Sequence, residues 1–196
     1  MAITVRPVDE DRFDDVQTVL GTRGQPARCQ CQGYRMGWYD MHSPDVAGRR
    51  ELLRDQVIEG HGLVAYLDDD EGDEAQDEPV GWCSLAPRRD YGYLRKTTWN
   101  GRDEDRADPG VWAVTCFVTR AGYRHRGVSR ALAAATVDLA RTHGARTLEA
   151  YPMRPAPGKE VTWGELHVGK LSSFLDAGFR IVHEPSLRRA VVRYDY

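Results

Sequence analysis

The sequence has no long apolar run. A helix that spans a bilayer needs about 18 or more consecutive apolar residues, and the 196 residues contain no such stretch. The N-terminal sequence MAITVRPVDEDRF also lacks the basic segment and the apolar segment of a secretory signal peptide. These absences predict a cytoplasmic protein that has no membrane partner.

Positive charge is not in excess either. Lysine and arginine together number 27 against 30 acidic residues, which gives a formal net charge of −3. Proteins that bind nucleic acid usually present a basic patch or stripe to the phosphate backbone, so no nucleic-acid partner is expected. The phosphate-binding patterns GxxxxGK[ST] and GxGxxG are also absent, which argues against a P-loop nucleotidase and a dinucleotide-binding turn.

Cysteine is scarce, and the four residues are Cys29, Cys31, Cys83 and Cys116. Structural disulfides are rare in a reducing cytosol, and a zinc site usually needs a second close pair to match the pair at 29 and 31. Cys83 and Cys116 lie in strand-like runs, where a free cysteine packs as a small apolar residue. We therefore expect no metal, and a packed turn at the Cys29/Cys31 pair.

The pattern of apolar residues predicts a single α/β domain over residues 1–196. A strand at 3–8 leads into a helix that begins near Asp9 or Asp11 and stops at Gly21. The other predicted strands cover 62–67, 79–87, 111–118, 146–153 and two segments after residue 178, and the other predicted helices cover about 46–59, 128–143 and 165–178.

Residues 111–118, VWAVTCFV, form a nearly continuous apolar run, which is typical of a strand buried on both faces in the middle of a sheet. The loop that follows, YRHRGVSRAL at 123–132, places three arginines and a histidine around Gly127 before an amphipathic helix. The N–H groups and the dipole at a helix start favour an anion, and glycine lets a phosphate approach the main chain. The loop therefore predicts a pyrophosphate site, with the alternative that its arginines only face solvent.

The segment CFVTRAGYRHRGVSRALAAATVDLARTHGARTLEAYPM resembles the central motif of the GCN5-related N-acetyltransferases, the GNAT family, whose loop has the pattern [QR]-x-x-G-x-[GA]. Arg124, Gly127 and Ser129 stand at the patterned positions, and Ser129 departs from the usual glycine or small apolar residue. FLDAGF at 174–179 resembles the closing helix-to-strand motif of the family. The resemblance implies an α/β fold with a mixed, mostly antiparallel central sheet, two splayed parallel strands and flanking helices.

The resemblance also implies that acetyl-CoA binds as cosubstrate in the cleft between the splayed strands. Main-chain groups of Phe117 and Val118 would bind the pantetheine arm. The pyrophosphate would lie over a run of seven loop residues, Arg124, His125, Arg126, Gly127, Val128, Ser129 and Arg130.

Acetyl transfer to an amine needs a neutral amine and a proton for the departing thiolate. In much of the family a tyrosine four residues before the glycine of the closing motif supplies or orders that proton, but here the position is Phe174. We predict Glu149 as the base, in a strand facing the cleft, and Ser172 or Tyr151 as the proton donor. Further donor candidates are Ser173 and Cys116, and further base candidates are Glu165 and His167.

The acceptor is expected to bind to residues 22–44 and 88–110, two irregular segments with aromatic side chains that can bracket an amine. Loops of this size favour the primary amine of a small molecule, such as an antibiotic or a specialised metabolite, over a protein surface. The alternatives are a peptide or protein amine, and a CoA-binding sensor without catalysis. The oligomeric state is left open between monomer and homodimer. The aromatic residues concerned are Trp38, Tyr39, Tyr91, Tyr93 and Trp99.

Overall fold

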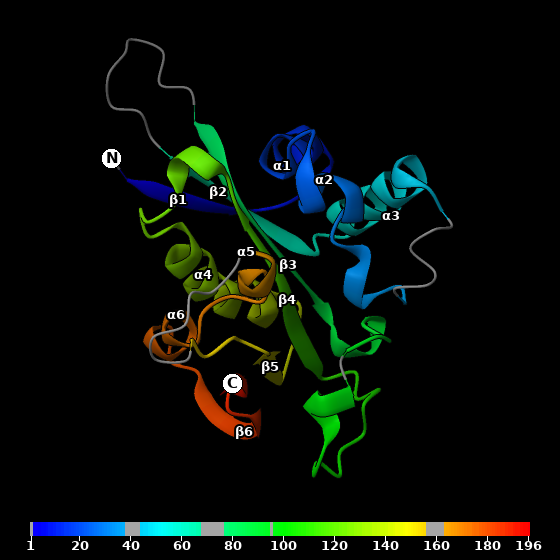
Figure 1. The fold of residues 1–196 in the computed structure, drawn as a ribbon, viewed down its shortest axis with the longest axis vertical. Coiled ribbons are helices and arrows are strands. Elements are labelled where there is room, and N and C mark those ends of the chain that lie inside the picture. Colours follow the sequence, from blue (N-terminus) through cyan, green and yellow to red (C-terminus); the bar gives the residue numbers. More distant parts are fainter. Residues whose placement is uncertain (1, 38–43, 68–76, 95, 156–162) are drawn as a thin grey trace.

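The computed structural model describes residues 2–37, 44–67, 77–94, 96–155 and 163–196. Its strands form one seven-stranded sheet in the order β1-β2-β3-β4-β5-β7-β6 (Figure 1). Every neighbouring pair is antiparallel except β4 and β5, which run parallel. This arrangement confirms the predicted mixed, mostly antiparallel sheet. The strands are β1 Ile3–Pro7, β2 Gly62–Leu67, β3 Glu78–Pro87, β4 Val111–Thr119, β5 Thr147–Ala150, β6 Arg180–Ser186 and β7 Arg189–Asp195.

Helices cover both faces of the sheet (Figure 1). Leu132 of α4 and Phe174 of α6 belong to one buried cluster, while Phe13 of α1 and Leu53 of α3 belong to another. Along β2, Leu63, Ala65 and Leu67 pack in the first cluster and Val64 and Tyr66 in the second, as the two faces of a pleated sheet require. The helices are α1 Phe13–Leu20, α2 Gly24–Cys29, α3 Val46–Ile58, α4 Val128–Thr142, α5 Trp163–Leu166 and α6 Leu171–Asp176, and the short 3-10 helices are η1 Glu10–Arg12, η2 Gln32–Tyr34, η4 Arg88–Asp90, η5 Lys96–Trp99 and η6 Ala121–Tyr123.

β4 lies in the middle of the sheet, as its apolar run predicts. Its residues are buried from Val111 to Phe117. The β3–β4 register shifts between Ser84 and Leu85, so that Thr115 is an extra residue on the β4 side. Such a bulge bends the strand and increases its twist, and it lies at the level where β4 and β5 separate.

The two parallel strands pair only over their first residues. Their register ends at Val114 opposite Ala150, whereas β4 continues to Thr119. The chain beyond β5 turns away from β4, and Met153 forms an isolated parallel bridge with Lys170 instead. The second half of β4 therefore has an edge that β5 does not pair with, which matches the expected splay.

The predicted closing helix at 165–178 is wrong as one continuous element, because α5 and α6 take its place. Gly169 lies between them with a φ of 79°, a left-handed conformation that ends a helix. Val168 is buried between the two helices and Leu175 is exposed, so they do not share the predicted apolar face. Phe174 is the side chain that α6 buries.

Candidate functional site

The loop between β4 and α4 ends at Gly127, the N-cap of α4. Gly127 has a φ of 88°, which glycine adopts without strain, and no side chain caps the helix there. Among the described residues, a Cβ added to Gly127 would meet only Ile3 Cδ1 within 4 Å, at 3.9 Å. The N–H of Arg130 donates to the Gly127 carbonyl at 2.9 Å, so the N–H groups at this open helix end that can bind an anion are those of Val128 and Ser129.

Positive charge surrounds the helix end. The guanidinium of Arg126 lies 5.5 Å from the centre of the Tyr123 ring, and Arg130 forms an ion pair of 2.7 Å with Asp176. An exposed ion pair contributes little free energy, so Arg130 can exchange Asp176 for a bound anion. The hydroxyl of Tyr123 donates to Glu78 of β3, and this hydrogen bond raises the pKa of Tyr123. The loop is thereby tied to the sheet.

The other residues of the predicted pyrophosphate loop differ in how far they are buried. Val128 is buried in the core, so only its main chain can face a ligand. Arg124 and Ser129 are half-buried, whereas His125 is exposed and has a φ of 64°. The sequence prediction of a phosphate cradle is therefore compatible with the backbone of the loop, and its use by a ligand stays a prediction.

Phe117, one of the two predicted pantetheine partners, lies on the part of β4 that β5 does not pair with, but its N–H is already hydrogen-bonded. The N–H of Phe117 points toward β5 and donates to the carbonyl of His167 at 2.6 Å. The N–H of Arg120 donates to the Val80 carbonyl of β3 at 3.0 Å. Main-chain groups of successive strand residues point to alternate edges, so the N–H and carbonyl of Val118 point toward β3, as the N–H of Arg120 does. This direction does not favour the predicted bond from Val118 to pantetheine.

Phe174 belongs to an aromatic cluster in the core. Its ring meets Phe117 and Phe179 edge-on, with centroid distances of 5.6 and 5.2 Å. Ser172 is exposed on α6, and Ser173 is half-buried. Residues two positions apart on a helix face nearly opposite directions, so Ser172 faces away from the buried ring. This position does not favour Ser172 as the donor, and its role stays a prediction.

Glu149 is the centre of a buried ion cluster on the other face of the sheet. One of its oxygens binds Arg193, with Nε at 2.7 Å, and also Arg102, while the other lies 3.2 Å from Arg88. The hydroxyl of Tyr151 donates to Glu149 at 2.8 Å. The structure thus brings the predicted residues Glu149 and Tyr151 together, but it surrounds the carboxylate with cations instead of facing it to the cleft.

A second carboxylate completes this cluster. Burial raises the pKa of Glu104, but hydrogen bonds from Arg102 and Arg193 outweigh that effect and lower it to about 2. Burial and the adjacent Glu149 raise the pKa of Tyr151 well above its ordinary value, so the phenol keeps its proton. Because Glu149 is fully buried and all its neighbours donate to it, the geometry favours a structural role over a base, and the catalytic role stays a prediction.

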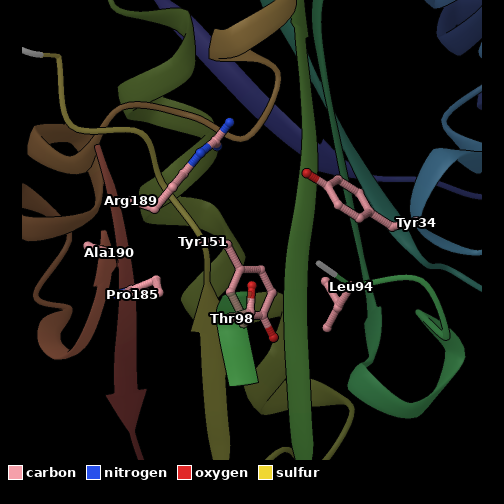
Figure 2. A pocket seen from close by; sticks show the side chains of 7 residues that line it. All are labelled: Tyr34, Leu94, Thr98, Tyr151, Pro185, Arg189 and Ala190. Carbon is pink, nitrogen blue, oxygen red and sulfur yellow. The ribbon is translucent and has the colours of Figure 1, made fainter. Parts of the chain in front are cut away.

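A small cavity of about 20 Å³, room for one water molecule, lies between this cluster and η2. The hydroxyl of Tyr34 and Nε2 of His167 are 3.2 Å apart, and their rings stack. His167 thus contacts the free edge of β4 through its carbonyl and Tyr34 through its ring. Figure 2 shows the lining side chains, which come from several elements: Tyr34, Leu94, Thr98, Tyr151, Pro185, Arg189 and Ala190.

The 88–110 segment builds a larger hollow of about 490 Å³ beside the cavity, and Leu94 lines both. The N–H of Tyr93 donates to the Tyr34 carbonyl at 3.0 Å, so the two predicted acceptor segments meet. The sequence does not predict Tyr34 as a site residue, because residues 22–44 have no clear hydrophobic periodicity from which its position could be inferred. The remaining lining residues are Arg88, Arg89, Tyr91, Gly92, Tyr93, Trp99, Arg106 and Ala107. The predicted acceptor residues Trp38 and Tyr39 lie outside the described residues.

A splayed parallel pair followed by an open, glycine-capped helix start defines the fold class that the sequence resemblance implies. The model of the acetyltransferase (GNAT) family matches residues 32–156, and the chain belongs to this family. No curated protein matches the chain significantly.

Several solved structures share the fold at low sequence identity. One is yncA of Salmonella typhimurium with its cofactor acetyl-CoA, at 12% identity and a TM-score of 0.53, covering 100% of this chain and 94% of that one. Another is the paia N-acetyltransferase of Thermoplasma acidophilum with coenzyme A, at 12% identity and 0.52, covering 100% of both chains. A third is the aminoglycoside acetyltransferase AAC(6')-Ib with coenzyme A and kanamycin, at 18% and 0.53, covering 99% and 95%.

Two features of the described part of the chain concern membranes and metals. None of its helices combines the length and the apolar character needed to cross a membrane. Among the same described residues, no three histidine, cysteine, aspartate or glutamate side chains lie close enough together to hold a metal ion.

Proposed function

We propose that this chain transfers an acetyl group from acetyl-CoA to a primary amine of a small molecule. The observation that carries the proposal is the open helix end at Gly127, ringed by arginines and placed directly after the free edge of β4. Family membership and the neighbours that hold acetyl-CoA or coenzyme A support this cosubstrate. We also propose that the protein acts in the cytoplasm, as a monomer or homodimer, without nucleic-acid or membrane partners.

The residues present fit acetyl-CoA, which supplies an activated acetyl thioester when bound. The N–H groups of the first turn of α4 and the side chains of Arg124, Arg126 and Arg130 hold its pyrophosphate, because a charge-assisted hydrogen bond to an anion is strong. The free edge of β4 holds the pantetheine arm. For Phe117 to use its N–H there, His167 must release the hydrogen bond that it now accepts.

The acceptor amine is placed on the opposite side of β4, between η2 and the 88–110 segment. There the Tyr34 cavity lies beside the hollow of the 88–110 segment. Guanidiniums already lie over the rings of Trp99 and Tyr91, so these two aromatic side chains do not bracket the amine as predicted. The kanamycin complex of a neighbour supports a small molecule as acceptor. Another neighbour that shares the fold is a ribosomal-protein-alanine N-acetyltransferase of Brucella melitensis, so a peptide or protein amine stays the alternative acceptor.

Proton handling is assigned to Tyr34 and His167, since Phe174 has no hydroxyl. In this proposal His167 accepts the proton of the amine, and the phenol of Tyr34 protonates the departing thiolate. Tyr151 and Glu149 hold the wall of the same cavity in place. Both assignments rest on the 3.2 Å contact of Tyr34 with His167.

Two measurements test the function. Calorimetry with acetyl-CoA tests binding, and chromatographic detection of released CoA over a panel of small amines and peptides tests transfer. Chromatography is preferred to a thiol dye because the four protein cysteines would react with the dye. Binding without release on any amine would favour the sensor alternative, and folded protein that does not bind acetyl-CoA would refute both readings.

A further inference from the structure

Two cysteines that the proposed chemistry does not use lie in contact. The Sγ atoms of Cys31 and Cys116 are 3.1 Å apart, although 85 positions separate these residues in the sequence. Cys31 is the N-cap of η2, one residue beyond the C-cap of α2, and Cys116 follows the bulge residue of β4. A disulfide needs the sulfurs about 2.05 Å apart, so an approach of about 1 Å would join them.

The turn that carries Cys31 is held in an unusual conformation. Gln30 and Cys31 have φ angles of 47° and 56°, which non-glycine residues adopt rarely. A chain of side-chain amides fixes the turn. The amide of Gln17, which is half-buried, donates to the Gln30 side chain at 2.9 Å. Those of Gln32 and Gln56, which are buried, donate to the Gln30 carbonyl and to the Gln32 side chain, each at 3.1 Å. The surroundings therefore impose the position of Cys31.

The sulfur of Cys31 has a second specific partner. Nε1 of Trp82 donates to it at 3.1 Å. This contact favours the thiolate, but the contact with Cys116 and burial outweigh it and raise the pKa of Cys31 well above its ordinary value, so oxidation depends on the closeness of the two sulfurs and is slow. Cys116 and Cys31 are 8% and 5% exposed, so a small oxidant can reach them better than a bulky one. Cys83 is fully buried in the cluster on the opposite face of the sheet, and the Sγ of Cys29 faces the Pro26 carbonyl at 3.8 Å.

We propose that Cys31 and Cys116 form a redox modification site, at which a peroxide joins them in an intramolecular disulfide and a thiol reductant reopens it. One thiolate attacks a peroxide oxygen and becomes a sulfenic acid as the first water leaves. The other thiol then attacks the sulfenic sulfur, the S–S bond forms, and the second water leaves. Two thiols and one peroxide thus give one disulfide and two waters.

The disulfide would tie the turn before η2 to the bulge of β4. That turn leads to Tyr34, so the cross-link pins one wall of the small cavity to the central strand. The bond would also close a long loop of the unfolded chain, and this restricts the unfolded state. Oxidised protein is therefore expected to unfold at a higher urea concentration than reduced protein.

The decisive experiment is peptide mapping of the native full-length protein after hydrogen peroxide treatment and blocking of free thiols. Trypsin releases CQCQGYR, residues 29–35, and ADPGVWAVTCFVTR, residues 107–120. We expect these two peptides to be joined in the oxidised sample and separate after reduction with dithiothreitol. The number of free thiols should fall from four to two, and the rise in the urea midpoint should disappear on reduction.

Matched variants identify the partners. Cys29→Ser and Cys83→Ser should still form the joined peptides, whereas Cys31→Ser and Cys116→Ser should not. Four results would each overturn the proposal. They are a disulfide at Cys29 instead of Cys31, a dimer linked between chains, over-oxidised cysteines without a cross-link, and four free thiols after treatment. Because Cys29 and Cys31 lie in the same tryptic peptide, fragmentation of the joined peptides by tandem mass spectrometry identifies which of them is linked to Cys116. This measurement on the unsubstituted protein decides the matter even if a variant does not fold, and it does not depend on acetyl transfer.

Discussion

Replacing Glu149 by glutamine separates a structural carboxylate from a catalytic one. The carboxylate is 0% exposed and lies against three guanidiniums, of which Arg88 and Arg102 have side chains only 1% and 5% exposed. Glutamine keeps the shape but removes the charge that compensates these cations. Removing one partner of a buried ion pair costs about 3 to 5 kcal/mol. Because Glu104 still faces the same arginines, we expect a loss at the lower end, about 3 kcal/mol.

Urea denaturation followed by tryptophan fluorescence measures this loss in Glu149→Gln. The matched control is Glu104→Gln, whose side chain is 33% exposed and should cost at most about 1 kcal/mol because solvent screens it. In the folded Glu149→Gln variant, turnover should keep the pH profile of the unsubstituted protein. An unchanged urea midpoint together with loss of the basic-catalyst limb of that profile would refute the structural role and restore Glu149 as the base.

Four other outcomes are expected. Changing both Arg124 and Arg126 to alanine should weaken CoA, measured by calorimetry, more than an analogue without the pyrophosphate; equal losses would contradict the cradle. Tyr34→Phe should lower turnover more than it changes the acetyl-CoA KM, and an unchanged rate would exclude Tyr34 as the donor. The pKa of Glu104 is lowered from 4.5 to about 2, so its contribution to stability is present above pH 4.5 and is lost as the pH falls toward 2. The urea midpoint should therefore fall over this pH range, and the fall should be smaller in Glu104→Gln. Phe174→Tyr should lower the urea midpoint without raising turnover, because the added hydroxyl enters an apolar cluster; a gain in turnover would show that the position still serves catalysis.

The sequence predicts the backbone of the site well because local patterns determine it. The apolar run 111–118 can bury both faces only in a central strand, and Gly127 supplies the left-handed residue from which α4 starts. Gly21 likewise ends α1 at the predicted place, with a φ of 71°. In each case one residue type at one position decides the structure, so a single sequence is enough.

The chemical part of the site could not be predicted in the same way. The sequence predicts that the Glu149 carboxylate faces the cleft. Its partners Arg88, Arg102 and Arg193 lie at distant positions in the sequence, and no spacing pattern links them to Glu149. The same holds for Tyr34 and His167, which are 133 positions apart. Periodicity also misled at 165–178, where Gly169 breaks the helix. Contacts between distant segments depend on the packed fold, which local patterns do not encode.

The division of the sheet into two faces explains why Phe174 does not by itself argue against catalysis. Phe117 and Cys116 are neighbours on β4, yet Phe117 packs with α4 and α6 while Cys116 packs with the cluster of α1 and α3. A residue of α6 reaches β4 from the first face, and there the aromatic cluster needs an apolar ring. Tyr34 and Tyr151 reach the strand from the second face, where the 88–110 segment builds the hollow. A phenol on that face is close to the proposed acceptor site instead of the core. The proposed donor and the proposed acceptor site thus share one side of the sheet, and substitutions there should alter acceptor kinetics before they alter the affinity for CoA.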